Sequence, residues 1–300
     1  MTESRKGYTL VFLAGALWGF IGFFVTYLNK MGVDPFNIAF LRDFYGAIFF
    51  IFVVIRLNGI GGLKPNKKEL LLAVAIGLIC QTLFNISYTI AINNVGVATG
   101  AILLYTSPMF VTLLSWVVFK EKLNRIKAIA LLINISGCVL TVTNGNFSVL
   151  EFSVYGVIMG TLAGFLYALL TIFGKIAGNL NCNVETISLY SFITATIALF
   201  IIAQPLNHLE ILFKWEVIVL SIGYGLIPTA LSYYLYMLGL TKPVEASKVP
   251  VVASVETVVA AMIGIALFNE LFGIYKLIGI LLVMISVALM SWQRRINVKG

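Results

Sequence analysis

The sequence predicts an all-α integral membrane protein in which ten membrane-spanning helices form two inverted five-helix repeats, with both termini in the cytoplasm. Three observations lead to this prediction. The composition is strongly apolar, ten apolar runs are each long enough to cross a bilayer, and the first half of the chain recurs in the second half at an offset of 149 residues.

Composition excludes most classes of soluble protein. Of the 300 residues, 60% are hydrophobic and only 11% are charged, and the mean hydropathy is +1.02, whereas soluble proteins carry about 25% charged residues. At about 20 residues per span, the chain holds about ten spans and no further folded soluble domain. We therefore expect a multi-pass protein of the cell membrane, namely the cytoplasmic membrane of a bacterium or archaeon.

Polar, glycine and proline residues divide the chain into ten predicted helices. Arg5 and Lys6 mimic the start of a signal peptide, but the apolar stretch that follows is too long for one, so we interpret it as a retained first helix. The predicted helices are Tyr8–Leu28, Asn37–Ile55, Leu70–Ile90, Val97–Val118, Ile126–Thr143, Val154–Ile176, Thr186–Ala203, Trp215–Leu235, Ala246–Leu267 and Ile274–Trp292.

The basic residues predict the orientation in the membrane. If the N-terminus is inside, three of the 20 lysines and arginines (Lys30, Lys214 and Lys276) lie outside, and Arg42 lies within a span. The other sixteen lie inside: Arg5, Lys6, Arg56, Lys64, Lys67, Lys68, Lys120, Lys122, Arg125, Lys127, Lys175, Lys242, Lys248, Arg294, Arg295 and Lys299. This bias places both termini in the cytoplasm. It also explains the net charge of +8 without a nucleic-acid partner.

The internal repeat predicts the symmetry. At the offset of 149 residues, Phe119 pairs with Phe268 and Glu121 with Glu270, and the polar pair is more telling than the matches among apolar residues. We place the repeats at residues 1–146 and 147–300, within one integrated bundle. Because each repeat has five helices, the second must enter the membrane from the opposite face, as in secondary transporters.

The motifs resemble those of the EamA-type ten-helix branch of the drug/metabolite transporter superfamily, over essentially the whole chain. They are Trp18-Gly19, Arg42, Thr106-Ser107-Pro108, Phe119-Lys120-Glu121, Ser254-Val255-Glu256-Thr257 and Phe268-Asn269-Glu270. Thr257 stands where the family often has proline, so we expect Pro250 to supply a kink in this helix instead. The resemblance implies a carrier of amino acids, other metabolites or toxic compounds, and it favours export over uptake.

Glu256 is the outstanding candidate for a substrate-binding or proton-coupling residue. It lies about ten residues into its helix and therefore about 15 Å deep, close to the bilayer midplane. A carboxylate there costs at least a few kcal/mol unless it is protonated, paired or facing water. The alternative is a protonated side chain that only forms a hydrogen bond within the bundle.

Further polar and aromatic residues are predicted to line a central cavity with Glu256. Arg42 is a candidate substrate ligand that could instead extend to the membrane surface, and Asp43 could simply balance its charge. Gln81, Asn85 and Tyr88 follow helical spacing on one face. The remaining candidates are Trp18, Tyr105 and Tyr167, each near the middle of its helix, and Tyr233, which shares one face of its helix with Thr229, Ser232 and Tyr236. For any one of the uncharged residues, ordinary packing between helices is the alternative.

The sequence thus predicts a secondary active transporter, and more specifically an exporter, of a small polar or amphipathic metabolite such as an amino acid, by alternating access around Glu256. It contains no catalytic, nucleotide or metal motif, so we expect neither an enzyme nor a cofactor. The expected partners are a small-molecule substrate, the lipid bilayer and coupling protons. A membrane-embedded enzyme or lipid-handling protein and a passive channel remain as alternatives.

Overall fold

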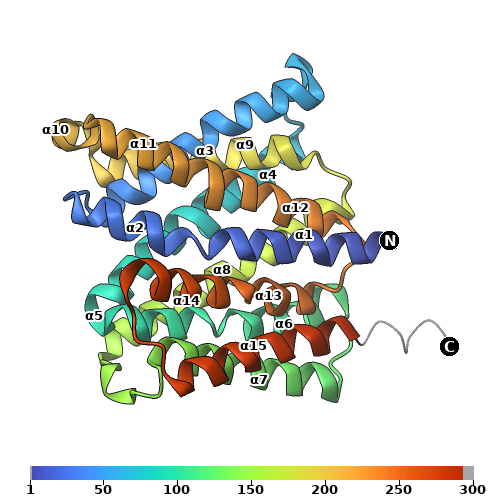
Figure 1. Cartoon of the computed structure of the whole chain (residues 1–300). Coiled ribbons are helices and arrows are strands. Elements are labelled where there is room, and N and C mark those ends of the chain that lie inside the picture. Colours follow the sequence, from blue (N-terminus) through green and yellow to red (C-terminus); the bar gives the residue numbers. More distant parts are fainter. Residues whose placement is uncertain (1, 293–300) are drawn as a thin grey trace.

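The computed structural model describes residues 2–292, and within this range the chain contains helices and no β-strand (Figure 1). The α-helices are α1 (Glu3–Trp18), α2 (Ile21–Lys30), α3 (Pro35–Asn58), α4 (Lys67–Ala75), α5 (Phe84–Leu104), α6 (Ser107–Phe119), α7 (Arg125–Thr143), α8 (Val154–Asn179), α9 (Val184–Ala203), α10 (Leu209–Leu212), α11 (Trp215–Tyr224), α12 (Ser232–Thr241), α13 (Val249–Ala253), α14 (Val255–Phe268) and α15 (Ile274–Trp292). Two π-helical segments, η2 (Ile76–Leu83) and η5 (Gly225–Leu231), join α4 to α5 and α11 to α12. Short 3₁₀ turns occupy Ile60–Leu63, Phe147–Val149, Pro205–His208 and Ala246–Lys248.

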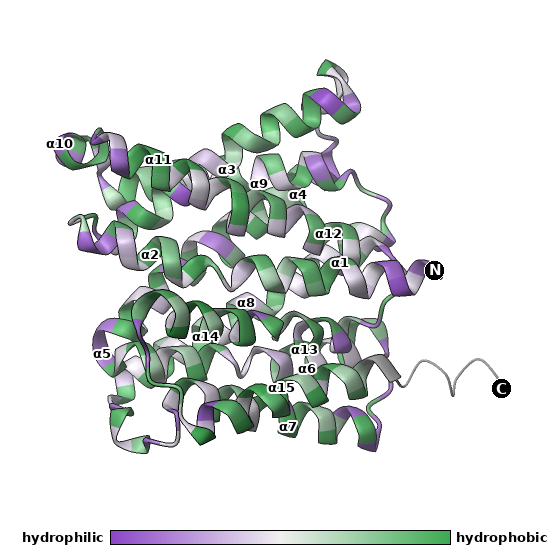
Figure 2. Ribbon diagram, in the orientation of Figure 1, coloured by the Kyte–Doolittle hydropathy of each residue, from purple (hydrophilic) through white to green (hydrophobic). Residues whose placement is uncertain are grey.

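The outer surface is that of a membrane protein. Hydrophobic residues cover the sides of the bundle and polar residues gather at its two ends (Figure 2). Large apolar side chains such as Leu71, Leu132 and Ile201 are each at least 67% exposed, which suits contact with lipid tails. The chain is therefore an integral membrane protein.

Eight helical segments of the described chain are long and apolar enough to cross a membrane. They are Glu3–Lys30, Pro35–Asn58, Lys67–Leu104, Arg125–Thr143, Val154–Asn179, Val184–Ala203, Trp215–Thr241 and Ala246–Phe268, and two shorter apolar helices cover Ser107–Phe119 and Ile274–Met290. The prediction of ten spans differs at two places. The predicted last span is represented by the shorter helix Ile274–Met290, and Lys67–Leu104 counts as one segment although it contains one predicted span and the start of the next. Its backbone nevertheless leaves the helical conformation at Gly96, where φ is +71° and ψ is 167°.

Irregular features of the backbone recur at the 149-residue offset. Both π-helical segments, η2 and η5, begin at equivalent positions. The helix breaks at Tyr105, before α6, and at Ser254, before α14, are also equivalent. Left-handed residues end α6 at Lys120 (φ +57°) and α14 at Asn269 (φ +53°). The repeat therefore extends from the sequence to the backbone.

The packing of the helices follows the same symmetry. Helix α3 packs against its counterpart α9, and α7 packs against its counterpart α15. Helix α1 packs against α12, and the equivalent pair in the other repeat, α8 and α5, also packs together. Exchange of the two halves thus leaves the pattern of neighbours unchanged.

The start of α1 and the end of α15 lie at the same end of the bundle (Figure 1). We call this the terminal end and the other one the far end. The loops after α3, α6, α8 and α12, which the charge distribution assigns to the cytoplasm, also lie at the terminal end. Arg294, Arg295 and Lys299, assigned to the same side, lie outside the described residues.

The kink expected at Pro250 was wrong. The helix that carries Glu256 breaks at Ser254, where φ is −64° and ψ is −4°. Pro250 lies in the first turn of α13, where a proline removes no intrahelical hydrogen bond and so produces no kink.

Candidate functional site

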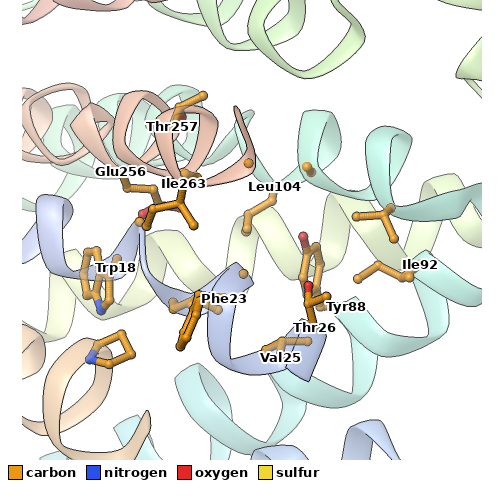
Figure 3. Close-up of a pocket in the computed structure, with 18 of the residues that line it drawn as sticks. Trp18, Phe23, Val25, Thr26, Tyr88, Ile92, Leu104, Glu256, Thr257 and Ile263 are labelled. Carbon is orange, nitrogen blue, oxygen red and sulfur yellow. The ribbon is translucent and has the colours of Figure 1, made fainter. Parts of the chain in front are cut away.

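A cavity of about 720 Å³ lies between the two repeats. It begins at Trp18, Tyr167, Tyr233 and Glu256 in the interior and reaches exposed residues at the far end, such as Asn93 and Glu270. Figure 3 shows the side chains that enclose it: Glu256, Thr257 and Ile263 from α14, Trp18 from α1, Phe23, Val25 and Thr26 from α2, and Tyr88, Ile92 and Leu104 from α5. The cavity is therefore open toward the far end.

Glu256 lies in the first turn of α14, directly after the break at Ser254. The amide nitrogen of Asn134 on α7 donates hydrogen bonds to the hydroxyls of Ser254 (2.6 Å) and Ser286 (2.9 Å), so the break is held from both α7 and α15. Glu256 itself forms no hydrogen bond or ion pair with any residue in the described range. Its carboxyl group is thus partly buried and faces the cavity without a partner among the described residues.

Gly15 in α1 and Gly19, directly after it, allow this helix to approach α13 and α14. A Cβ atom at Gly15 would overlap the carbonyl oxygen of Ala253. One at Gly19 would lie 2.5 Å from Cβ of Val259 and 3.0 Å from the carbonyl oxygen of Glu256. The close approach brings the end of α1, and with it Trp18, beside the helix that carries Glu256.

Aromatic side chains form the inner end of the cavity. The ring of Trp18 lies 6.0 Å from that of Tyr167, 5.8 Å from that of Tyr233 and 4.8 Å from that of Tyr236. The Tyr236 hydroxyl is hydrogen-bonded to Thr171 at 2.7 Å. These contacts make an aromatic floor, of which Trp18, Tyr167 and Tyr233 line the cavity and offer their ring faces to a bound molecule.

Arg42 and Asp43 pair with one another although they are adjacent on α3. The Arg42 Nε atom donates to Asp43 Oδ1 at 2.9 Å, and both side chains are buried. Arg42 lines the cavity and Asp43 does not. The Nη2 atom of Arg42 is buried and has no hydrogen-bond partner within the described chain, so it can still donate to a ligand.

The structure brings most of the predicted site residues together. Eight of the nine line the cavity: Glu256, Arg42, Trp18, Asn85, Tyr88, Tyr105, Tyr167 and Tyr233. Gln81 does not, because it lies in the π-helical segment η2. The wider turn changes the angle between Gln81 and Asn85, and the Gln81 amide points to Ser191 on α9 at 3.4 Å.

The lining also includes polar residues that the sequence interpretation missed, among them Thr26, Asn29, Thr89, Asn93 and Thr141. Thr89 and Asn93 follow Asn85 at helical spacing, so continuing the polar face of that helix would have found them. Thr26 and Asn29 follow the break after Trp18, which the apolar pattern of the first helix does not reveal.

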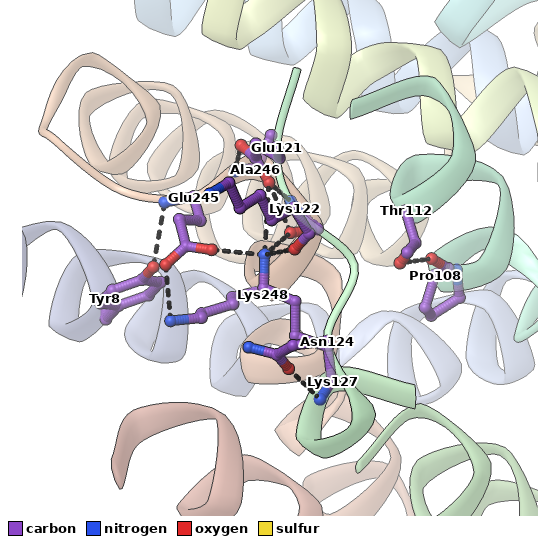
Figure 4. A network of polar contacts seen from close by, with 11 residues as sticks. Tyr8, Pro108, Thr112, Glu121, Lys122, Asn124, Lys127, Glu245, Ala246 and Lys248 are labelled. Atoms are coloured by element: carbon purple, nitrogen blue, oxygen red, sulfur yellow. Dashed lines mark hydrogen bonds and ion pairs between the residues drawn. The ribbon is translucent and has the colours of Figure 1, made fainter. Parts of the chain in front are cut away.

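At the terminal end, a polar network closes the bundle (Figure 4). Glu121, just after α6, accepts hydrogen bonds from the peptide nitrogens of Ala246 (2.6 Å) and Ser247 (3.1 Å) and from the Ser247 hydroxyl (2.5 Å). Lys127 pairs with Glu245 and donates to the Ser247 hydroxyl at 3.0 Å. The network ties α6 and α7 to the start of the helix that carries Glu256.

Two further contacts extend this network. The Tyr8 hydroxyl on α1 accepts a hydrogen bond from the peptide nitrogen of Glu245 at 3.0 Å, and Lys248 pairs with Glu245 at 2.7 Å. Burial raises the pKa of the Glu245 carboxyl, but the ammonium groups of Lys127 and Lys248 outweigh burial and hold the pKa below its usual range. None of these residues lines the cavity.

Comparison with known proteins identifies the family. The model of the EamA-like transporter family matches the chain twice, at residues 5–143 and 154–292. An uncharacterized transporter of Archaeoglobus fulgidus is 28% identical over 289 residues, 96% of this chain and 97% of the relative. The uncharacterized inner membrane transporter YicL of Salmonella typhimurium is 22% identical over 300 residues and 98% of both chains.

A solved crystal structure has the same fold. It matches with a TM-score of 0.79 and covers 99% of both chains at 15% identity, so the likeness concerns the fold alone. The two family matches together span both repeats. The chain therefore belongs to the EamA-like transporter family, and it is a multi-pass membrane transporter rather than an enzyme.

Proposed function

We propose that the chain is a secondary transporter that carries a small polar or amphipathic metabolite, such as an amino acid, across the cytoplasmic membrane by alternating access. The observation that supports this proposal most is the cavity, which is open at the far end, closed by polar contacts at the terminal end, and has Glu256 at its inner part. A passive channel needs a path through the whole membrane, whereas a carrier is closed at one end at a time.

The proposal includes ten spans, five in each repeat, with the repeats divided near residue 146 and inverted relative to one another. The kink at Gly96 supports a division of Lys67–Leu104 into two spans, of which the second continues through α6. The positions of the carboxylates support the inversion. Glu121 contacts Ala246 at the terminal end, whereas its counterpart Glu270 lies at the mouth of the cavity at the far end.

Charge balance supports a substrate with a positively charged group. Glu256 has no partner in the described chain, so an ammonium group of the substrate would compensate its charge. The aromatic floor around Trp18 suits a cation with an apolar body. The free Nη2 atom of Arg42 could bind a carboxylate, and an amino acid carries both groups.

Export and proton coupling complete the proposal. With the terminal end in the cytoplasm, the open cavity faces outward and gives Glu256 access to external protons. The name of the Salmonella typhimurium relative, an inner membrane transporter, supports the placement in the cytoplasmic membrane. The resemblance to exporters supports the direction.

The test is transport by purified protein in liposomes. Radiolabelled amino acids and aromatic amines are offered in counterflow, and the parent is compared with Glu256→Gln and with the control Glu216→Gln, whose side chain is exposed at the start of α11. We expect saturable counterflow by the parent and by the control. Glu256→Gln should lose proton-driven accumulation by at least about tenfold, since its amide keeps the shape but cannot exchange a proton.

Two outcomes would contradict the proposal. Flux that rises linearly with concentration and shows no counterflow would indicate a channel. Equal transport by Glu256→Gln and the parent from pH 5.5 to pH 8 would show that Glu256 neither binds the substrate nor couples its movement to protons.

A further inference from the structure

Glu121 and Glu270 occupy equivalent places in the two repeats. Each follows a helix that ends in a left-handed residue, Lys120 or Asn269. The peptide nitrogen of Glu121 donates to the carbonyl of Ser115 at 3.2 Å, and that of Glu270 donates to the carbonyl of Gly264 at 3.1 Å. The two backbones thus have the same local form, at opposite ends of the bundle.

Both carboxylates pair with equivalent lysines, Glu121 with Lys127 at 3.9 Å and Glu270 with Lys276, but their other contacts differ. Glu121 accepts three hydrogen bonds from Ala246 and Ser247, and its side chain is only 13% exposed. Glu270 pairs with Lys276 at 2.7 Å, and its side chain is 52% exposed. Because the two backbones match, we attribute the different contacts of the two carboxylates to the two ends of the bundle. The terminal end, at Glu121, is closed, and the far end, at Glu270, is open.

The symmetry predicts the missing partners of Glu270. The residues equivalent to Ala246 and Ser247 are Val97 and Ala98, which directly follow the kink at Gly96. Both line the mouth of the cavity, together with Glu270 and Lys276. At the start of a helical segment, peptide N–H groups lack an acceptor from a preceding turn, and they attract a negative charge.

We propose that Glu121 and Glu270 are two alternating latches. In the state that the structure shows, Glu121 holds the terminal end closed through Ala246 and Ser247, and Glu270 is released. In the opposite state, Glu270 binds the peptide nitrogens of Val97 and Ala98 and closes the far end, while Glu121 is released from Ala246 and Ser247 and keeps only its ion pair with Lys127. This inference rests on the proposed alternating access and names the groups that hold each state.

The two latches contain different groups, and this difference makes one of the two states more stable than the other. Ser247 supplies a hydroxyl to Glu121, whereas the equivalent residue Ala98 has none to offer Glu270. Ser247 also bonds to Lys127, and Glu245 adds ion pairs to Lys127 and Lys248. Without substrate, the state with the terminal end closed is therefore the more stable one.

The test measures two distances between spin labels on the full-length protein in lipid nanodiscs, without substrate. One pair, Arg125→Cys with Pro243→Cys, spans the terminal end. The other, Asn94→Cys with Leu271→Cys, spans the far end, and all four side chains are exposed. The variants are Glu121→Gln, Glu270→Gln and the control Glu216→Gln. In Glu121→Gln an amide nitrogen replaces one carboxylate oxygen and cannot accept a hydrogen bond, so this latch is weakened.

In Glu121→Gln we expect the terminal-end distance to lengthen and the far-end distance to shorten. The ratio of the two populations should change by about tenfold, the effect of losing one hydrogen bond to a charged group. Glu270→Gln should enrich the parent's own state, and the control should match the parent. Ser247→Ala places the same residue at position 247 as at the equivalent position 98. It should shift the ratio of the two populations in the same direction as Glu121→Gln, but by a smaller factor.

Unchanged distances in a folded Glu121→Gln, or a shift of Glu270→Gln in the same direction as Glu121→Gln, would overturn the latches. If Glu121→Gln does not fold, Ser247→Ala and Glu270→Gln must still shift in opposite directions. Because the distances are measured without substrate, a parent that transports nothing but shows these shifts would defeat the proposed function and leave the latches standing.

Discussion

At the scale of single residues, the charges inside the bundle are of two kinds. Arg42 and Asp43 neutralise one another within a buried pair, and removing either would leave an uncompensated charge. Glu256 has no such partner in the described range and is tolerated because it faces the open cavity. This contrast, rather than burial alone, makes Glu256 the functional candidate of the three.

Glu245 at the terminal end provides a test of pH dependence outside the membrane spans. Because Lys127 and Lys248 hold its pKa below the usual value of 4.5, the ionised carboxylate stabilises the folded state above that value. The stabilisation is lost as the pH falls through the lowered pKa. We expect Glu245→Gln to lower the midpoint of thermal unfolding at pH 7, and the difference from the parent to shrink on acidification.

Thermal unfolding from pH 7 to pH 3.5 would check this prediction, with Glu216→Gln as the control because its side chain is exposed and away from the network. A difference between Glu245→Gln and the parent that stays constant over the whole range would show that the ion pairs do not stabilise the fold.

In the candidate site, the sequence signal is clearest where a single side chain carries it. Glu256 stands out in any helical register because a carboxylate in an apolar helix is costly. Gln81 illustrates the limit, since its direction depends on a π-helical turn that no residue in Ile76–Leu83 announces. The sequence did not predict the pairing of Arg42 with Asp43 either, because this pairing depends on how the long Arg42 side chain bends back toward Asp43.

At the scale of elements, the site depends on interruptions of helices. The break at Ser254 places Glu256 in a first turn, and the end of α1 at Trp18 places an indole next to the cavity. The sequence predicted the helices themselves because apolar length is a strong signal. It did not predict the break at Ser254, since tertiary hydrogen bonds from Asn134, rather than a local proline or glycine, accompany this break.

The contact of α1 with α13 gives a test at this scale. A methyl group at Gly15 would overlap the carbonyl oxygen of Ala253, so Gly15→Ala must push the two helices apart. We expect a loss of about 1–3 kcal/mol of stability, as for other overpacked contacts. The matched control is Gly22→Ala, because a Cβ atom there would meet nothing within 4 Å.

Unfolding of both variants in the same detergent would measure the difference. We expect Gly15→Ala to unfold at a lower temperature, and Gly22→Ala to be unchanged or slightly stabilised, since alanine reduces the freedom of the unfolded chain. Equal midpoints would mean that α1 does not pack closely against α13.

At the scale of the whole molecule, the two repeats share one backbone plan but differ in the contacts at their ends. The equivalent breaks at Tyr105 and Ser254 and the equivalent residues Lys120 and Asn269 show how far the plan extends. The offset of 149 residues was visible in the sequence because a few polar residues, above all Glu121 and Glu270, recur. The sequence did not reveal which end of the bundle is open, because Glu121 and Glu270 give the same signal in both repeats.

The orientation in the membrane decides what the open cavity faces, and single cysteines can test it. The distribution of basic residues predicts that the terminal end is cytoplasmic. Lys64 lies in the loop after α3 at the terminal end, and Asn207 lies in the loop after α9; both are exposed. Cys80 and Cys138 are buried, so replacing Cys182 by serine gives a suitable background.

In intact cells, an impermeant thiol reagent should label Asn207→Cys, whereas Lys64→Cys should react only after the membrane is made permeable. This result would place the mouth of the cavity, with Glu270 and Val97, outside. The Glu121 latch would then hold the cytoplasmic gate. The reverse labelling pattern would put the open cavity on the cytoplasmic side, so Glu256 would take up substrate and protons from within the cell, and the charge rule on which the orientation rests would fail for this chain.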